Sequence, residues 1–438
     1  MSGPRSERGQ VSRGSTPLRA ASAPLSLDDL RVHPGPPLAD ADLPRAAVVI
    51  LNHNGRRHFE GCFGSLAALD YPRERLEVWL VDNGSSDGSL AELRTRHPWV
   101  RLHANPSNLG FAPACNQGAS LAAGAEVLVF LNNDMRVEPS WLRELVGPIV
   151  RGEAQATTAK MYSWDGKRID SAGGGMNFHG IGIQHGYKEE PSPEHDLPRR
   201  TLFACGGAMA VGADVFAAAG GFDPEYFAYY EDVDLGWRLW VLGHEVHYAP
   251  AAVCYHHHSS TSRTFPSETV RLLQVRNPLL SCVKNYDDEN LRAVLPAALG
   301  LFLRRMLLVS GLGDPRPFRI EHARGEPRGP LARLVAALRG GSSRALREAR
   351  VPITRIAAAD LIGANDLLGR WEHWMARRAE VQSRRRRPDA EIFRLFLNPL
   401  WCIEDEPAYR ELHSGLARFT GLEQIFEGLS VPGGEPHR

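Results

Sequence analysis

The stretch VLVFLNNDMRVEPSWL, residues 127–142, changes from a strand pattern to a helix pattern around three consecutive polar residues. Its first five residues are wholly apolar, which indicates a strand buried on both faces, as found inside a parallel sheet. Asn132, Asn133 and Asp134 follow directly and are expected at the carboxyl edge of that sheet. Because open α/β sheets bind ligands in the crevice at this edge, the three side chains are candidates for a binding site.

The segments that precede this stretch repeat the same order, an apolar strand followed by polar turn residues. Strands are predicted at residues 48–51, 77–81 and 100–105, and each is followed by Asn, Asp, Gly or Ser residues that favour a turn. Helical patterns separate the strands, which is typical of a doubly wound, mostly parallel α/β sheet. The polar loops are therefore expected to gather at one edge.

Composition narrows the class of protein. The 438 residues are 43% hydrophobic, enough for a large core and a second domain, and the 51 basic residues balance the 51 acidic ones. Six scattered cysteines without a CxxC pair favour reduced thiols in a cytosolic setting. Residues 1–43 are rich in Pro, Ser, Gly and Arg, lack the apolar stretch of a signal peptide, and are predicted to form a disordered tail.

Two carboxylates are expected at the binding edge. Asp82 follows its strand directly, where a carboxylate can accept hydrogen bonds from a base N–H or a ribose hydroxyl. Asp134 would converge on the same crevice and, with a bound diphosphate, would suit a hard cation such as Mg²⁺. The spacing agrees equally with the alternative that Asp134 caps the helix begun in EPSWLREL.

A second acidic segment, residues 220–239, has the sequence GGFDPEYFAYYEDVDLGWRL. Its carboxylates stand among aromatic residues, and an apolar setting raises the pKa of a carboxylate, as a general base requires. The same letters are also typical of a helix start, where acidic residues are favoured by the helix dipole. The residues alone leave both interpretations open.

Six motifs in chain order resemble those of the family 2 glycosyltransferases of GT-A fold, closest to their bacterial rhamnosyltransferase-like branch. The motifs are VVILNHNG, LVDNGSSDGS, NLGFAPACNQG, LNNDM, GGFDPEYFAYYEDVDLGWRL and YAPAAVCYHHHSS. Each is weak alone, but six in order over residues 44–262 are specific. The resemblance implies a GT-A catalytic domain at residues 44–265 and an inverting enzyme that uses Mg²⁺ or Mn²⁺ and a nucleoside diphosphate sugar.

The resemblance also implies roles for the donor side of the site. Asp82 would hydrogen-bond the donor's pyrimidine, while Asn52 and Asn54 would border the nucleoside pocket. The remaining donor-binding candidates are Asn108, Gly110, Asn132 and Asn133. Asn132 occupies the first acidic position of the family's metal-binding Asp-x-Asp, so Asp134 would be the only anionic metal ligand from this loop.

The same resemblance implies roles for residues on the acceptor side of the site and for a histidine near the metal. Asp232 matches the catalytic base and Glu231 is expected to orient the acceptor, while His256 falls where the family often has a histidine near the metal or diphosphate. One base suffices because an acceptor hydroxyl must lose a proton while it attacks the anomeric carbon opposite the departing diphosphate. Asp234 and Arg238 are expected to have structural roles.

The sequence predicts the donor and the acceptor less closely than it predicts the class of reaction. The branch resemblance favours a dTDP- or UDP-linked donor, with rhamnose as the preferred sugar, and a hydroxyl acceptor on a glycan or lipid-linked molecule in cell-surface polysaccharide synthesis. The Gly/His-rich loops at residues 162–198 are expected to form a lid. Two alternatives remain, a sugar-nucleotide-binding protein without transfer activity and a nucleotidyltransferase, although LNHNGRRHFEG is not the Gly-rich basic loop of the latter.

Residues 266–438 are predicted to be mainly helical and rich in arginine. Residues 291–387 contain 20 Arg, no Lys and 8 acidic residues, without a helix-turn-helix, zinc or aromatic-interleaved signature, so nucleic acid is not an expected partner. Residues 294–312 are apolar but interrupted by Arg304 and Arg305, and are expected to be too short and too charged to span a bilayer. We expect a cytoplasmic protein in peripheral contact with anionic lipid at the inner face of the membrane. The alternative is a helical domain packed on the catalytic one with a solvated arginine face. No pattern indicates an oligomeric state.

Overall fold

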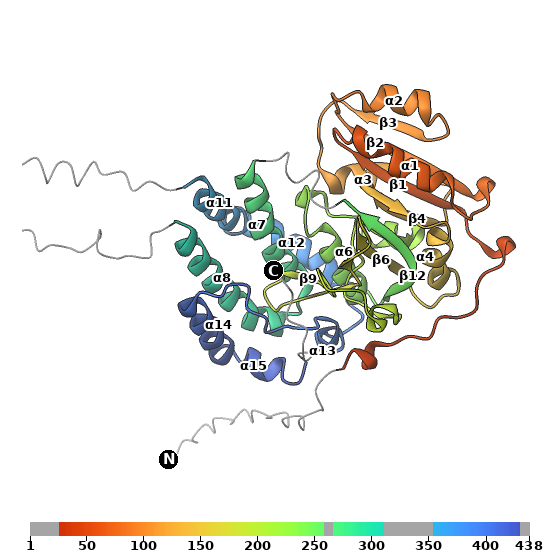
Figure 1. The fold of residues 1–438 in the computed structure, drawn as a ribbon. Helices are drawn as coiled ribbons and strands as arrows, with labels where there is room; N and C mark the ends of the chain where they lie inside the picture. The colour runs from red at the N-terminus through yellow and green to blue at the C-terminus, as the bar shows by residue number, and fades with distance from the viewer. Residues whose placement is uncertain (1–25, 258–265, 311–353, 430–438) are drawn as a thin grey trace, which may run out of the picture.

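The computed structural model describes residues 26–257, 266–310 and 354–429 (Figure 1). Its centre is a ten-stranded sheet with the order β10-β12-β6-β11-β4-β1-β2-β3, in which β5 also pairs with β12 and β7 with β6. The strands of this sheet are β1 Ala46–Asn52, β2 Leu76–Asn83, β3 Arg101–Asn105, β4 Val127–Asn132, β5 Met135–Val137, β6 Ala156–Ser163, β7 Ile169–Ser171, β10 Arg199–Arg200, β11 Ala208–Gly212 and β12 Val246–His256. A separate hairpin pairs β8 Gly174–Met176 with β9 Gly182–Gln184.

Strands β3, β2, β1 and β4 are parallel, whereas β11 runs antiparallel to β4 and β6. The mostly parallel α/β sheet predicted from the sequence is therefore confirmed. In the register, Asn52 lies beside Asp82 and Leu51 lies beside Asn132. Polar residues at the ends of three strands consequently share one edge.

Helices cover both faces of this sheet (Figure 1). The helices are α1 Phe59–Ala67, α2 Ser89–Arg96, α3 Phe111–Leu121, α4 Trp141–Val150, α5 Ala213–Ala219, α6 Glu231–Val241, α7 Ser267–Asn285, α8 Asp288–Ser310, α11 Arg355–Gly369, α12 Trp371–Gln382, α13 Asp389–Ile392, α14 Pro407–Phe419 and α15 Leu422–Ile425. Alternate residues of β1 enter different cores: Val48 and Ile50 pack with α1 and α4, while Val49 packs with α3 and α6. Burial on both faces explains why the central strands are continuous apolar runs.

The C-terminal region is helical, as predicted, and it shares a core with the catalytic part. The ring of Trp237 in α6 contacts those of Tyr286 and Phe396 edge to face, with centroids 4.7 and 5.6 Å apart. Residues on both sides of the predicted boundary at residue 265 therefore pack into one hydrophobic core.

The predicted disordered tail of residues 1–43 is wrong for residues 26–43. A short 3₁₀ helix, Leu27–Leu30, is capped by Ser26. The backbone of Arg31 forms an antiparallel β-bridge with Arg199 of β10. Leu30 and Leu43 are only 3% and 1% exposed, so burial of these two apolar side chains holds the segment against the domain. Residues 1–25 lie outside the described residues.

Helix α8 contains the apolar segment that the sequence predicts to be too short and too charged to span a bilayer, and no observation tests that prediction directly. The helix has 23 residues and contains an 18-residue window with a mean hydropathy of 1.6, and among the described residues it is the one helix long and apolar enough to cross a membrane by length and composition. In this fold it packs against α7, α11 and α14. Arg304 and Arg305 pair with Glu406 and Glu404 at 3.0 and 2.7 Å.

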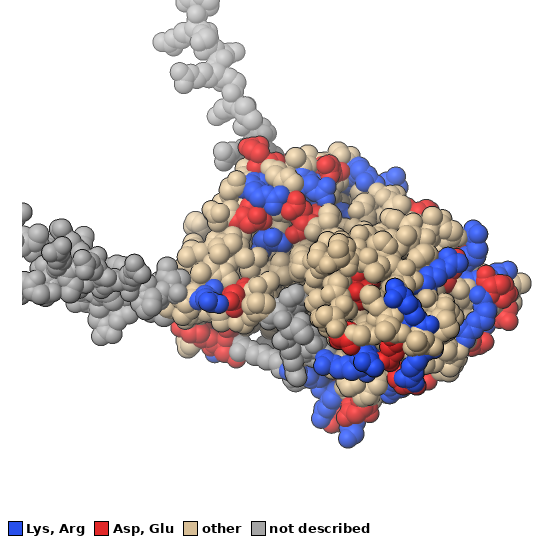
Figure 2. Space-filling view, turned by 90° about the horizontal axis from the view of Figure 1, so that it is seen from above, with Lys and Arg blue, Asp and Glu red and all other residues tan. Residues whose placement is uncertain are grey.

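The arginines of the C-terminal region are largely neutralised where the structure describes them. Eight of those between residues 291 and 387 form ion pairs, among them Arg370 with Glu225. Figure 2 shows basic and acidic side chains interspersed over one face of the molecule. The described helices thus resemble the packed-domain alternative more than a free arginine face, while nine Arg lie in residues 311–353, outside the described part.

Candidate active site

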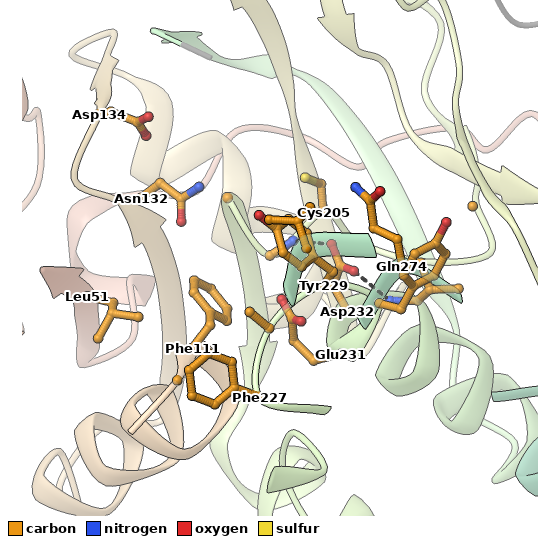
Figure 3. Close-up of a pocket in the computed structure, with 18 of the residues that line it drawn as sticks. Leu51, Phe111, Asn132, Asp134, Cys205, Phe227, Tyr229, Glu231, Asp232 and Gln274 are labelled. Atoms are coloured by element: carbon orange, nitrogen blue, oxygen red, sulfur yellow. Dashed lines mark hydrogen bonds between the residues drawn. The ribbon is translucent and has the colours of Figure 1, made fainter. Parts of the chain in front are cut away.

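A cavity of about 550 Å³ opens at the shared edge of β1, β2 and β4 (Figure 3). Leu51, Asn83 and Asn132 reach it from these three strands, and Glu231 and Asp232 reach it from the start of α6. Gly182 and Gln184 of the predicted lid also line it, together with Gly206 and Gly207 before β11. The candidate residues therefore come from distant parts of the sequence.

The nucleoside side of this cavity differs in detail from the sequence-based prediction. Asp82 is fully buried, and its carboxylate accepts hydrogen bonds from the Asn52 amide at 2.8 Å and from the Ser85 backbone at 2.9 Å. Asn54 accepts from the Ser86 backbone in a turn where its own φ is +55°. Asp82, Asn52 and Asn54 thus support the loops behind the cavity, and their contact with a donor remains a prediction.

Asn83 is the residue of this strand that faces the cavity, and sequence reasoning missed it. Its amide donates to Asn108 Oδ1 at 3.2 Å and to the Gly110 carbonyl at 3.0 Å. Gly110 has a φ of +94°, and a Cβ there would lie 2.6 Å from the Phe227 ring, so the close approach requires glycine. Asn108 and Gly110 therefore lie on the cavity wall, as their assignment to the donor site demands.

The loop after β4 carries Asn132, Asn133 and Asp134 to the cavity. Asn133 is buried, and its amide donates to Asn52 Oδ1 at 2.7 Å, while the Asn132 backbone donates to the Gly207 carbonyl. Helix α4 begins only at Trp141, after Ser140, so the alternative that Asp134 caps this helix is wrong. Asp134 instead precedes the short strand β5.

His256, at the end of β12, lies between two carboxylates. Its Nε2 is 3.4 Å from Asp134 Oδ1 and its Nδ1 is 2.7 Å from Asp170 Oδ2. Burial lowers the pKa of His256, but the hydrogen bonds and charges of the two aspartates outweigh that effect and raise the pKa to about 10. Nothing in the sequence around Asp170 marked it as a partner of this histidine.

Asp134 and His256 could hold a divalent cation that takes few protein ligands, and the protonated His256 would release its Nε2 proton when the cation binds. The described residues contain no group of three or more His, Cys, Asp or Glu side chains able to hold a metal. Asp134 and His256 supply one carboxylate and one imidazole, and a hexacoordinate cation would complete its shell with water and diphosphate oxygens. Asp170 would orient His256 through Nδ1, as carboxylates commonly do for metal-binding histidines.

The other histidines of the HHH sequence are only partly described. His257 is exposed, its ring stacks on Trp164 with centroids 4.1 Å apart, and its backbone donates to the Asp134 carbonyl at 3.0 Å. It therefore supports the loop of Asp134 through its backbone. His258 lies outside the described residues.

At the start of α6, beside the cavity, Glu231 is buried and Asp232 is half-buried. Asp232 accepts from the Gly206 backbone at 2.9 Å and from the Val233 backbone at 2.8 Å, and burial raises its pKa despite these donors. Burial and the charge of Asp232 raise the pKa of Glu231, whose Oε2 has no hydrogen-bond partner among the described residues. The pair has the environment expected of a proton acceptor.

Asp234 and Arg238 lie behind this pair rather than in the cavity. Asp234 Oδ2 is 2.8 Å from Arg238 and 2.9 Å from Lys284 of α7, and Lys284 is 2.7 Å from Asp223. All of these groups are buried. Their structural role, expected from the sequence, agrees with this placement.

Known proteins similar to this chain are sugar transferases and envelope glycan proteins. The family model for glycosyl transferase family 2 matches residues 47–213. An N-acetylglucosaminyl-diphospho-decaprenol L-rhamnosyltransferase of Mycobacterium tuberculosis is 31% identical over 229 residues, covering 46% of this chain and 73% of that protein. The O-antigen biosynthesis protein RfbC of Myxococcus xanthus is 30% identical over 217 residues, covering 45% of this chain and 16% of that protein.

Among solved structures, a crystal structure of GalNAc-T7 with UDP, GalNAc and Mn²⁺ is similar, with a TM-score of 0.49 and 18% identity over 63% of this chain and 53% of that one. The match to the mycobacterial rhamnosyltransferase covers 73% of that relative at 31% identity. The chain belongs to glycosyl transferase family 2.

Proposed function

We propose that the protein is an inverting glycosyltransferase that moves a sugar from a nucleoside diphosphate donor to an acceptor hydroxyl. The observation that carries this proposal is the placement of two chemically different groups around one cavity (Figure 3). Asp134 with His256 lies at one wall, where a diphosphate would be neutralised. The half-buried Asp232 lies at another, where a proton would be accepted.

The reaction requires one proton acceptor and one charge stabiliser. Asp232 takes the proton of the acceptor hydroxyl as that oxygen bonds to the anomeric carbon. The bond from this carbon to the diphosphate breaks at the same time, and the diphosphate leaves with the electron pair. Attack from the face opposite the leaving group inverts the anomeric configuration. Glu231 lies beside this base and orients the acceptor.

A divalent cation, Mg²⁺ or Mn²⁺, would be held by Asp134 and His256 and would stabilise the charge that grows on the leaving diphosphate. Asn132 and Asn133 hold the backbone of this loop in place. With a single carboxylate in the loop, the site binds the cation together with the donor rather than as a closed protein cage.

The donor and acceptor are proposed from the relatives. The name of the mycobacterial relative specifies a rhamnosyl group and a diphospho-decaprenol acceptor, and that of RfbC specifies O-antigen biosynthesis. We therefore propose a dTDP- or UDP-linked donor, with rhamnose first among sugars. The acceptor would be a hydroxyl of a glycan or lipid-linked molecule in cell-surface polysaccharide synthesis.

An anchored acceptor would place the protein in the cytoplasm, peripherally at the inner face of the membrane. Large apolar side chains are exposed on α8 and α11, namely Leu303, Val309, Ile356, Leu361, Ile362 and Leu368. The C-terminal end of α8 and the N-terminal end of α11 lie at the same side of the molecule (Figure 1). These side chains and the nine Arg of residues 311–353 support contact with anionic lipid.

A donor screen tests the proposal and separates it from the two alternatives. The protein is incubated with UDP-, dTDP- and GDP-sugars and Mn²⁺, and both thermal stabilisation and release of nucleoside diphosphate are measured. A transferase is stabilised by one donor class and releases its nucleoside diphosphate. Stabilisation without release under every acceptor tried indicates a binding protein, and pyrophosphate exchange with a sugar phosphate indicates a nucleotidyltransferase.

A further inference from the structure

The segment between β11 and α6 that leads into the acidic pair has an unusual backbone. Phe227 has φ +62° and ψ −64°, and the Ala228 N–H donates to the Tyr226 carbonyl at 2.7 Å, which together define the rare, strained form of the γ-turn. Tyr229 and Tyr230 follow with φ values of +68° and +67°. Three non-glycine residues out of four thus have positive φ, which persists only where the surroundings impose it.

This segment sets the position of the catalytic pair. Tyr230 is the residue before α6, so the backbone passes directly from the strained conformation into Glu231 and Asp232. Phe227 and Tyr229 line the cavity beside them (Figure 3). The Phe227 carbonyl also accepts the N–H of Phe111, which ties the segment to the start of α3.

The side-chain amide of Asn277, on α7, holds this backbone through hydrogen bonds. Asn277 is fully buried, and its amide donates to the carbonyls of Tyr226, Ala228 and Tyr229 at 3.1, 3.0 and 2.7 Å. Two amide hydrogens are shared among three acceptors, so the amide group lies at the centre of the turn. Arg276 fixes the orientation, because its Nε donates to Asn277 Oδ1 at 3.0 Å.

Arg276 also reaches the same segment directly. Its Nη2 donates to the Glu225 carbonyl at 2.6 Å, one residue before the segment begins. Farther along α7, Ser281 Oγ is 2.9 Å from the hydroxyl of Tyr226. Helix α7 therefore presents a row of polar contacts to the segment, and the amide of Asn277 makes most of its carbonyl contacts.

We infer that Asn277 is a positioning residue for the transfer reaction: it holds the strained segment of residues 226–230 and thereby fixes Asp232 against the Gly206 backbone. The inference rests on the proposed function, since it assigns Asp232 the role of base. It also gives the helical region a part in the chemistry, because Asn277 lies on α7, in the C-terminal region that follows β12.

The test compares Asn277→Ala and Asn277→Asp with Asn285→Ala. Asn285 is the matched control, because it lies on the same helix, is equally buried, and donates to Asp234 and the Ser281 carbonyl rather than to the segment. Asn277→Asp keeps the volume of the side chain but replaces the amide donors with oxygen, which three carbonyls repel. Asn277→Asp therefore still fills the space of the side chain, whereas Asn277→Ala does not. Both variants lose the hydrogen bonds to the three backbone carbonyls.

Two readouts are measured at a temperature where all variants are folded. The first is nucleotide release from the donor that gives the largest release in the screen, with water as acceptor. We expect kcat to fall about 100-fold in both Asn277 variants while KM for the donor changes less than about threefold, since displacing a catalytic group by about 1 Å costs about this factor. Asn285→Ala should keep kcat within about threefold.

The second readout is amide hydrogen exchange, which needs no activity. Exchange at residues 226–232 should accelerate in the Asn277 variants and stay near that of the unchanged protein in Asn285→Ala. Equal kcat losses in Asn277→Ala and Asn285→Ala, full activity of Asn277→Asp, or unchanged exchange at residues 226–232 would overturn the inference. Absence of nucleotide release from the unchanged protein with every donor would count against the proposed function, while the exchange readout would still decide the placement of the segment.

Discussion

Asp232 accepts two backbone hydrogen bonds and is partly removed from water, and these two features have opposite effects on its pKa. Burial raises the pKa of Asp232, whereas the N–H groups of Gly206 and Val233 stabilise the carboxylate and lower it. The result is a carboxyl group with a pKa above the ordinary value and a fixed orientation. Such a group accepts a proton more readily than an exposed aspartate does.

We expect Asp232→Asn to lose transfer while retaining the donor. The change removes the proton acceptor and leaves the nucleoside and diphosphate contacts intact, so turnover should fall about 10²–10⁴-fold. Nucleotide release and donor-induced thermal stabilisation measure the two properties separately. Asp214→Asn, at an exposed position of α5, is the control and should behave like the unchanged protein. Near-normal turnover of Asp232→Asn would reassign the base to Glu231.

Asp134 is the carboxylate that we expect to make donor binding depend on a divalent cation. In Asp134→Ala, His256 keeps Asp170 as its partner but the loop loses its anionic ligand, so Mn²⁺ should stabilise the complex with donor far less. Calorimetric titration of donor with and without Mn²⁺ measures this difference. Asp165→Ala, an exposed aspartate after β6, serves as the control. Full activity of the unchanged protein in excess chelator would remove Asp134 from a metal site.

At the scale of elements, α6 is joined to α7 and α12 by a buried network of charges. Lys284 of α7 lies 2.7 Å from Asp223 and 2.9 Å from Asp234, and Arg377 of α12 lies 3.0 Å from Asp223. Burial raises the pKa of Asp223, but the charges and hydrogen bonds of Lys284 and Arg377 outweigh it and lower the pKa below the ordinary value. The network fixes the helix that begins with the catalytic pair.

Lys284→Met should destabilise the fold by roughly 3–5 kcal/mol at neutral pH, because it leaves two buried carboxylates without their shared cation. A carboxylate with a lowered pKa in the folded state contributes stability above its unfolded pKa, and the contribution is lost as pH falls. The difference between the two proteins should therefore shrink below about pH 4. Urea unfolding from pH 3 to 7 measures it.

The control for this change is Arg96→Met, which breaks an exposed ion pair with Glu60. Exposed pairs contribute little because water screens them, so its unfolding midpoint should stay close to that of the unchanged protein. If Lys284→Met unfolds at the same urea concentration as Arg96→Met, the buried network does not stabilise the fold.

At the scale of the whole molecule, the charges of the described residues are largely paired, whereas apolar side chains of α8 and α11 remain exposed. We expect the protein to float with vesicles that contain anionic lipid and to be released by salt, since electrostatic attraction to the surface is screened. Ile362, on α11, is 57% exposed. Replacing it and Leu361 with Ser should weaken flotation.

Leu121→Ser is the matched control, because Leu121 is an exposed leucine at the end of α3 in the catalytic part. It should float like the unchanged protein. Equal flotation of the Leu361/Ile362 double variant would show that these side chains do not form a membrane-binding surface. Equal binding of the unchanged protein to neutral and anionic vesicles would show that electrostatic attraction does not drive the contact.

The architecture and the general location of the site could be predicted from the sequence, because their signals are local. Apolar runs such as residues 127–131 indicate strands covered on both faces, and the polar residues after such strands are expected at the edge of the sheet. The loop of Asp134 was found in this way, whereas the roles of Glu231 and Asp232 came from the family resemblance, and the structure brings both groups to one cavity.

Only the tertiary structure shows which of two adjacent side chains faces the cavity. It alone also shows which distant residues hold the side chains of the site in place. Successive residues of a strand point to opposite sides, so Asp82 turns into the protein and Asn83 turns to the cavity, a choice that depends on which side other elements cover. Asp170 meets His256 from 86 residues away, and Asn277 reaches the segment before Asp232 from the helical region. Contacts of this range leave no local pattern, because they arise only when separate elements pack together.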